Sequence, residues 1–210
     1  MDFIDIFLHL DRHLNEWVLF FGPGIDVLLF LIVFCETGLV VTPFLPGDSL
    51  LFAVGALAAT ENSSLNIFEL LVFLTAAAIL GDAVNYAIGW RVGPKIFQNP
   101  TGRWLNKKHL LEAERFYERH GGKTILFARF LPIVRTFAPF VAGIGRMPYP
   151  RFAAYNVTGG VLWVGSILMA GYFCGNIPIV RQNFEWVVVG IIVVSLLPTF
   201  LHLMKKPTKV

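Results

Sequence analysis

The sequence predicts an all-α polytopic membrane protein in which two opposed re-entrant hairpins form an inverted repeat. Composition, the placement of basic residues and two proline-broken apolar segments support this prediction. Of the 210 residues, 56% are hydrophobic and 15% are charged, and the mean hydropathy is +0.66. Soluble domains carry about 25% charged residues, so a lipid bilayer is the better solvent for this chain. We expect a single membrane domain over residues 1–210, with about three to four full transmembrane helices and amphipathic interfacial helices.

The basic residues follow the positive-inside rule. Residues 14–89 contain seven acids and no Lys or Arg, whereas eight basic residues lie within 91–123 and three lysines within 205–209. Basic clusters that alternate with apolar spans predict cytoplasmic loops rather than a nucleic-acid surface. We therefore expect a multi-pass protein with a cytoplasmic C-terminus and no nucleic-acid partner.

The first half of the chain begins with an amphipathic interfacial helix over residues 1–23, where polar and apolar residues alternate at helical spacing. Acids stand where a secretory signal needs basic residues, so we expect no such signal. Residues 24–90 then hold a re-entrant hairpin near 43–60 and a full span at 67–90. Residues 24–42 are either a further span or the descending arm of that hairpin, and this choice leaves the side of the N-terminus open.

The second half follows a cytoplasmic amphipathic segment at 91–123. Residues 124–173 hold the second hairpin near 124–144 and a span at 152–173, and a final transmembrane helix lies at 185–204. Each span has about 20 mostly apolar residues, as a bilayer requires. Three tryptophans near the ends of the spans predict an interfacial aromatic belt: Trp90, Trp163 and Trp186.

The two hairpin segments are too interrupted to be simple spans. Each contains paired prolines and charged residues, and by the topology above each must enter and leave the membrane on one side. Broken backbone at membrane depth is tolerated only where it is buried in protein or lines a water-filled cavity. Both segments begin Phe-Leu-Pro, at 44–46 and 130–132, and continue to Phe-x-x-Gly, at 52–55 and 140–143. Interrupted segments at matching positions of two halves predict the midplane site of a transporter.

Five charged residues lie within the apolar segments: Glu36, Asp48, Asp82, Arg129 and Arg135. An unpaired charge at the bilayer centre costs about 2.5–3.5 kcal/mol on insertion scales, so these groups must pair, become neutral or face water. Three acids against two arginines leave one carboxylate over, which favours uptake and release of a proton. A break at Pro132 would let both arginines face one cavity, where paired arginines bind phosphate or carboxylate.

These charged residues also have structural interpretations. Asp82 would hydrogen-bond a neighbouring helix, Asp48 would cap the helix that begins near Gly47, and the arginines would form a lattice with the acids. Glu36 has no cap or turn to explain it. The histidines lie near interfaces without ligand spacing, and the phosphate-loop, nucleophile-elbow and zinc-protease motifs are absent. We therefore expect no enzyme, no metal and no cofactor.

Three motifs, at 34–52, 81–86 and 127–143, together resemble the DedA family of bacterial membrane proteins, which is related to eukaryotic VTT-domain lipid scramblases. The similarity covers nearly the whole chain. The resemblance implies two opposed re-entrant hairpins and a location in the bacterial inner (plasma) membrane. It also implies movement of lipids such as undecaprenyl phosphate or phospholipids between leaflets, linked to the proton-motive force.

The charges and the resemblance together predict a lipid-phosphate translocase that supports envelope homeostasis. Carried over by motif, Glu36 and Asp48 match the essential acids of the family, and Arg129 and Arg135 match its essential arginines. In this hypothesis the two arginines would bind the phosphate, the two acids would couple transport to protons, and Asp82 would be accessory. The partners would be membrane lipids and protons, and the oligomeric state is open. Two alternatives stand beside this prediction: a proton-coupled carrier for a small soluble ion, and a non-transporting membrane scaffold in which the charges form a structural lattice.

Overall fold

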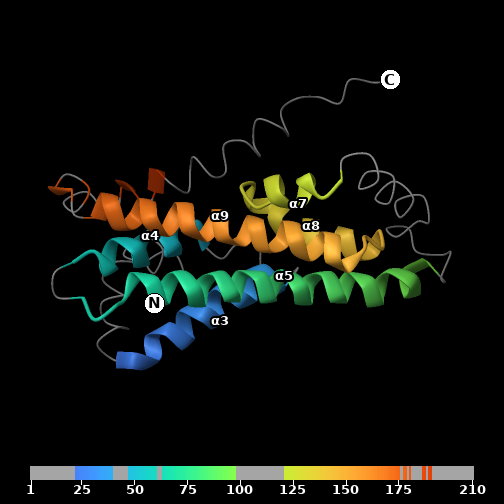
Figure 1. Cartoon of the computed structure of the whole chain (residues 1–210), viewed down its shortest axis with the longest axis horizontal. Coiled ribbons are helices and arrows are strands. Elements are labelled where there is room, and N and C mark those ends of the chain that lie inside the picture. Colours follow the sequence, from blue (N-terminus) through green and yellow to red (C-terminus); the bar gives the residue numbers. More distant parts are fainter. Residues whose placement is uncertain are drawn as a thin grey trace, which may run out of the picture. The chain divides into compact units, whose positions relative to one another are not determined.

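The computed structural model describes residues 22–39, 47–60, 63–97 and 121–175, with a few further positions between 177 and 190. Throughout these residues the regular structure is helical, which confirms the predicted all-α class (Figure 1). The elements are η1 (Gly22–Gly24), α3 (Ile25–Gly38), α4 (Gly47–Ala58), α5 (Ile67–Phe97), α7 (Lys123–Ala128), α8 (Pro132–Ile144) and α9 (Tyr149–Gly175).

Two of these helices are long and apolar enough to cross a membrane. They are Ile67–Gly93 of α5 and Tyr149–Gly175 of α9. The spans predicted at 67–90 and 152–173 are therefore confirmed as long apolar helices. Helix α5 continues past its apolar span to Phe97 and so includes the start of the segment predicted to be cytoplasmic.

Several predicted elements lie outside the described residues. These are the interfacial helix before Gly22, most of the cytoplasmic segment (98–120), the start of the first hairpin segment (43–46) and most of the final span at 185–204. The described part of the first hairpin segment is helix α4. The described part of the second consists of α7 and α8, which are separated by a break at 129–131.

The break between α7 and α8 follows from Pro132. A proline disfavours helical backbone in the residue before it, and Leu131 accordingly has an extended conformation, with φ −116° and ψ 106°. Pro132 itself begins α8, where its missing N–H would have no helical partner in any case. The chain restarts as a helix at once, since the Arg135 amide donates to the Leu131 carbonyl at 2.9 Å. The interruption predicted at this proline is confirmed.

The described helices divide between two compact units. Unit 1 comprises the described parts of residues 1–31, 44–75 and 164–210, and unit 2 comprises those of 32–43 and 76–163. Helices α5 and α9 each have one part in unit 1 and the other part in unit 2.

In unit 1, α4 and α9 pack backbone against backbone. Gly55 of α4 lies against Leu168, and Gly171 of α9 lies against Phe52; a Cβ atom on either glycine would overlap a backbone carbonyl oxygen. Gly171 and Gly175 have the G-x-x-x-G spacing that allows apolar helices to approach closely in lipid. Only glycine at these positions permits this approach.

In unit 2, α8 and α5 pack in the same manner. Gly143 of α8 lies against the backbone of Tyr86, and Gly89 of α5 lies against that of Phe140. Here too a Cβ atom on either glycine would overlap a carbonyl oxygen, and Gly89 and Gly93 again have G-x-x-x-G spacing.

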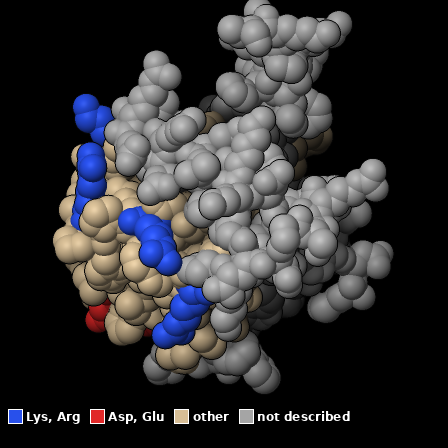
Figure 2. Space-filling model, turned by 90° about the vertical axis from the view of Figure 1, so that its right-hand side faces the viewer, with Lys and Arg blue, Asp and Glu red and all other residues tan. Residues whose placement is uncertain are grey.

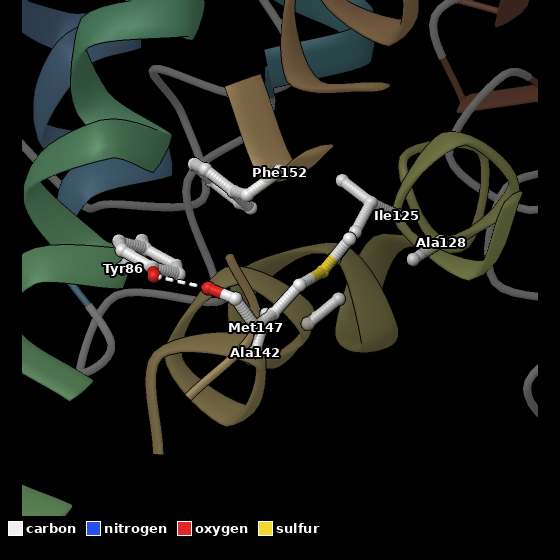
Figure 3. Packing of buried hydrophobic residues seen from close by; sticks show 7 residues of the cluster. Tyr86, Ile125, Ala128, Ala142, Met147 and Phe152 are labelled. Atoms are coloured by element: carbon white, nitrogen blue, oxygen red, sulfur yellow. Dashed lines mark hydrogen bonds between the residues drawn. The ribbon is translucent and has the colours of Figure 1, made fainter. Parts of the chain in front are cut away.

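The apolar core of unit 2 holds α7, α8 and the start of α9 against α5 (Figure 3). Tyr86 stacks on Phe152 with ring centroids 4.4 Å apart, and its hydroxyl donates to the Met147 carbonyl at 2.5 Å. The cluster consists of Tyr86, Ile125, Ala128, Ala138, Ala142, Met147 and Phe152. This core fixes the two short helices that carry the predicted arginines.

Two exposed basic side chains of unit 2, Arg91 and Lys123, come from the segment at 91–123 that the sequence predicts to be cytoplasmic. Figure 2 shows one face of the molecule on which Lys and Arg side chains gather with little acid among them. The exposed basic residues of unit 2 are Arg91, Lys123, Arg146 and Arg151. Arg146 lies over the ring of Trp90, with its guanidinium carbon 5.7 Å from the ring centroid.

Candidate functional site

Four of the five predicted charged residues are buried together in unit 2. The exposed fractions are 1% for Glu36, 3% for Asp82 and Arg129, and 8% for Arg135. The fifth, Asp48, is half-buried in the first turn of α4 and belongs to unit 1. Buried charges require partners, because desolvation of an isolated ion costs far more than folding can supply. The four charges in unit 2 form two acid–arginine pairs.

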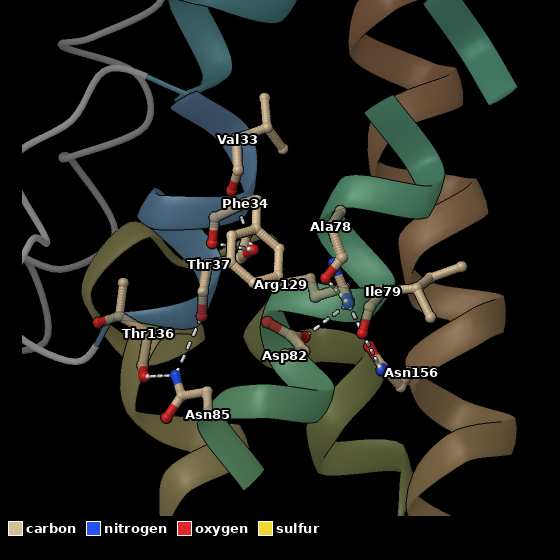
Figure 4. A network of polar contacts seen from close by, with 10 residues as sticks. All are labelled: Val33, Phe34, Thr37, Ala78, Ile79, Asp82, Asn85, Arg129, Thr136 and Asn156. Atoms are coloured by element: carbon tan, nitrogen blue, oxygen red, sulfur yellow. Dashed lines mark hydrogen bonds and ion pairs between the residues drawn. The ribbon is translucent and has the colours of Figure 1, made fainter. Parts of the chain in front are cut away.

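The first pair joins Arg129, at the end of α7, to Asp82 of α5. Arg129 Nη2 donates to Asp82 Oδ2 at 2.5 Å and to the side-chain oxygen of Asn156 on α9, and it lies 3.5 Å from the Ala78 carbonyl (Figure 4). Asn156 in turn donates to the Ile79 carbonyl at 3.0 Å. The pair is therefore part of a network that joins α5, the α7–α8 break and α9.

Two glycines of α9 give Arg129 its space. A Cβ atom at Gly159 would lie 2.8 Å from the Cδ atom of Arg129, and one at Gly160 would lie 3.8 Å from its guanidinium carbon. The Arg129 side chain thus runs along a strip of bare backbone before it reaches Asp82. Any larger residue at Gly159 would displace it.

The second pair joins Arg135, in the first turn of α8, to Glu36 near the end of α3. Arg135 Nη2 contacts Glu36 Oε1, and the two side chains are 8% and 2% exposed. The guanidinium also lies over the indole of Trp163, with 4.6 Å between its central carbon and the ring centroid. A cation–π contact of this kind is stronger when desolvated, at about 2 kcal/mol or more.

Asn85 connects the second pair to helix α5. Its Nδ2 donates to the carbonyl of Thr37 at 3.1 Å and to the carbonyl of Thr136 at 2.8 Å. Asn85 is fully buried, one helical turn beyond Asp82. Figure 4 shows it reaching from α5 to both α3 and α8.

Three buried polar or aromatic residues around the two ion pairs were not predicted from the sequence: two contact the arginines, and Asn85 contacts the backbone beside the second pair. The interpretation of Trp163 as an interfacial residue is wrong: it lies in the middle of α9, is 1% exposed and faces Arg135. Asn156 and Asn85 are amides inside apolar helices, and that alone was a usable signal, since polar side chains in a membrane helix need partners. What the sequence could not supply was the helix crossing that brings these residues to the two ion pairs.

The arrangement is chemically suited to hold and exchange charge. Two carboxylates balance two guanidinium groups, so the paired state is formally neutral and tolerated at membrane depth. Within the described ranges, no three His, Cys, Asp or Glu residues lie close enough together to hold a metal ion. The groups that the site does offer are two arginines able to bind an oxyanion and two acids able to take a proton.

Comparison with known proteins shows the family of the chain. The family model described as the VTT domain matches residues 45–173. The chain is 56% identical over 202 residues to Protein DedA of Escherichia coli K12, covering 96% of this chain and 92% of that one. It is 43% identical to an uncharacterized membrane protein of Mycobacterium leprae, covering 87% and 81%. It is 34% identical to the inner membrane protein YghB of E. coli K12, covering 85% and 84%.

No solved structure matches the chain. The family model covers the helices that carry Asp82, Arg129 and Arg135, and the alignment with Protein DedA extends over nearly the full length. These matches confirm the resemblance inferred from the sequence motifs. The chain belongs to the DedA family of membrane proteins.

Proposed function

We propose that this protein is a transporter that moves a phosphate-bearing lipid, undecaprenyl phosphate or a phospholipid, between the leaflets of the bacterial inner membrane with coupling to protons. Family membership supports the membrane setting, and ionisable groups buried between membrane helices mark a transport pathway by default. The choice of lipid as cargo rests on the resemblance of the motifs. The roles of the individual residues rest on the geometry of the two ion pairs.

The observation that carries the proposal is the position of Arg135 between the Glu36 carboxylate and the Trp163 ring. Arginine binds phosphate bidentately, in the same geometry in which it binds a carboxylate. A lipid phosphate would therefore compete with Glu36 for the same guanidinium. The aromatic face would keep the cation in place during the exchange.

Protonation of Glu36 lowers the free-energy cost of this exchange. Removing one partner of a buried ion pair costs about 3–5 kcal/mol, because the other charge is left uncompensated. If Glu36 takes up a proton as the phosphate arrives, the phosphate replaces the lost negative charge and Arg135 stays paired. One proton and one negative charge on the lipid then enter together, and the site remains neutral. Proton coupling follows from this balance.

The remaining predicted residues take supporting roles in the proposal. Arg129 would provide the second contact to the phosphate, and Asp82 would act as the accessory acid that holds Arg129 when the site is empty. Asp48, in the first turn of α4, would be a second proton-coupling acid.

We further infer that α4 and the α7–α8 segment are arms of two re-entrant hairpins related by an inverted repeat. Support comes from the glycine contacts of the two units. In the contacts of α8 with α5, Phe140 and Gly143 of α8 lie 88 positions after Phe52 and Gly55 of α4. Likewise, Tyr86 and Gly89 of α5 lie 82 positions before Leu168 and Gly171 of α9. A repeat in which each hairpin packs on the long helix of the other half accounts for both offsets.

We place the exposed basic end of unit 2 and the C-terminus in the cytoplasm. The basic side chains at this end come from the end of α5, the start of α7 and the α8–α9 turn, three places that one topology puts on the same side. The positive-inside rule favours the cytoplasmic side for all of them. The protein is then a multi-pass inner-membrane transporter and not an enzyme.

The proposal is tested by lipid translocation in proteoliposomes. The wild-type protein should speed the movement of a fluorescent anionic phospholipid between leaflets, and a pH gradient should change the rate. Arg135→Ala should slow movement at least roughly tenfold, and Glu36→Gln should abolish the response to the pH gradient. Arg151→Ala, which removes an exposed arginine of the same unit, is the matched control and should behave as wild type. Folded Arg135→Ala protein with wild-type rates would overturn the proposal.

A membrane scaffold is the second candidate, because the two acids and two arginines of unit 2 balance without any ligand. The charge-swapped double variant Glu36→Arg/Arg135→Glu separates the two functions. A scaffold should recover both folding and cellular function in this variant. A transporter should recover folding at most, since the cation would then stand on α3 rather than beside Trp163.

A further inference from the structure

Asn85 is a buried amide that the transport steps above do not use. Its nitrogen donates to two backbone carbonyls that are far apart in sequence, those of Thr37 and Thr136. Thr37 directly follows Glu36, and Thr136 directly follows Arg135. A single side-chain nitrogen on α5 therefore holds the backbone next to both members of the second ion pair.

The local structure makes the Thr37 carbonyl available to this amide. Helix α3 ends at Gly38, so the Thr37 carbonyl is among the last four, which have no acceptor role within the helix. Gly81 brings α5 unusually close at this point, because a Cβ atom there would overlap the Thr37 hydroxyl oxygen. Asn85 lies one turn further along α5 and thus reaches the end of α3 directly.

The Thr136 carbonyl lies beside a second irregularity. Pro139 stands inside α8 and has no N–H to donate to the carbonyl four residues earlier, that of Arg135. A proline in this position also pushes the preceding turn open. Asn85 donates into this turn at 2.8 Å from the Thr136 oxygen and so ties the loosened start of α8 to α5.

Helix packing alone gives no reason for an amide at this position. In the corresponding glycine crossing of unit 1, the residue 82 positions after Asn85 is Ile167. Within the described part of the chain no donor reaches the side-chain oxygen of Asn85, and a buried unsatisfied acceptor costs about 1–3 kcal/mol. An apolar residue would avoid that cost, so the amide is explained by what its nitrogen holds.

We propose that Asn85 is a positioning residue for transport: it fixes the ends of α3 and α8 so that Glu36 and Arg135 meet beside Trp163. The role rests on the proposed function, in which Arg135 exchanges between Glu36 and the lipid phosphate. Asn85 touches neither ion and acts only through the two backbone segments. Loss of the amide should let α3 and the start of α8 separate and should move Arg135 off the indole.

Trp163 gives a readout of this position that does not depend on transport. Replacing Trp17, Trp90, Trp104 and Trp186 by Phe leaves Trp163 as the single emitter. Arg135→Met in this background provides the emission spectrum without the cation. Asn85→Leu should shift the Trp163 spectrum toward that reference and slow lipid translocation at least roughly tenfold. Asn85→Gln, which keeps the donor, should recover part of both.

Asn156→Leu is the matched control, since Asn156 is also a buried amide but serves Arg129. It should leave the Trp163 spectrum unchanged. An unchanged spectrum in folded Asn85→Leu protein overturns the proposal, as does an equal shift in Asn156→Leu. If Asn85→Leu does not fold, the smaller Asn85→Ser decides by the same comparison. A shifted spectrum together with wild-type protein that moves no lipid overturns the transport function and leaves the positioning role standing.

Discussion

The glycine crossing of α4 with α9 in unit 1 and that of α8 with α5 in unit 2 use the same contacts but different neighbours. Gly55 lies on Leu168 in one, and Gly143 lies on Tyr86 in the other. The position of Asp82 corresponds, by the same offset of 82 residues, to Val164. Unit 1 thus builds the crossing with aliphatic residues where unit 2 has acid and amide.

This difference separates the helix packing, which we call the frame, from the charged site. Because unit 1 packs its crossing around Val164 and Leu168, helix packing in this fold does not require buried charge. The charges of unit 2 cost desolvation energy that an aliphatic core would avoid. Since unit 1 has aliphatic residues at positions 164 and 168, the buried charges of unit 2 point to a site and not to a requirement of helix packing.

The largest expected effect comes from breaking the Arg129–Asp82 pair on one side only. Arg129→Met leaves the Asp82 carboxylate buried without its cation, and it should lower the free energy of unfolding by about 3–5 kcal/mol. The double variant Arg129→Met/Asp82→Val installs the residue that unit 1 carries and should recover most of the loss. Unfolding in mixed dodecyl maltoside and SDS micelles measures both.

A lipid translocation assay shows whether the stabilised double variant is still functional. The double variant should fold and move no lipid, because its frame is intact and Arg129 is gone. A single Arg129→Met variant as stable as wild type would show that unit 2 tolerates an unpaired acid, and the contrast between the units would then carry no functional meaning.

The long helices and the break at Pro132 were predictable from sequence because each depends on local properties. Apolar length defines the spans at 67–90 and 152–173, and a proline acts on its immediate neighbours. The buried charges were also predictable, since their rarity in apolar segments is a sequence property. The repeated Phe-x-x-Gly contains Gly55 and Gly143, but the sequence did not predict that these glycines lie where helices cross.

The pairing within the site was not predictable. The break at Pro132 predicted that Arg129 and Arg135 could share one site, but it could not show that the first meets Asp82 and the second Glu36. That choice depends on where α3, α5 and α8 cross, and the crossings depend on glycines whose partners lie in other helices. The role of Trp163 was misjudged because it was assigned to the end of a span, although it lies in the middle of the predicted span 152–173. Its contact with Arg135 depends on the helix crossing and was not predictable.

A smaller effect should come from the glycine crossings themselves. Gly55→Ala and Gly143→Ala each place a methyl group against a carbonyl oxygen, so the helices must separate, at about 1–3 kcal/mol in the free energy of unfolding. If the two crossings are equivalent, the two losses should be similar. Gly24→Ala is the control, because no atom lies within 4 Å of a Cβ there. A loss at only one crossing would refute the equivalence.

The smallest expected effect on stability comes from removing the hydrogen bond that the Tyr86 hydroxyl makes. Unit 1 has Leu168 where unit 2 has Tyr86, whose hydroxyl donates to the Met147 carbonyl and so ties α5 to the α8–α9 turn. Tyr86→Phe removes the hydroxyl and keeps the ring on Phe152. It should therefore cost about 0.5–1.5 kcal/mol in the free energy of unfolding.

Lipid translocation by Tyr86→Phe should stay close to the wild-type rate, because the hydroxyl belongs to the frame and touches neither ion pair. Tyr149→Phe, which alters an exposed tyrosine near the same cluster, should change neither stability nor transport. A Tyr86→Phe protein that folds normally but loses transport would place the α8–α9 turn within the transport cycle. The division between helix packing and charged site would then fail at Tyr86.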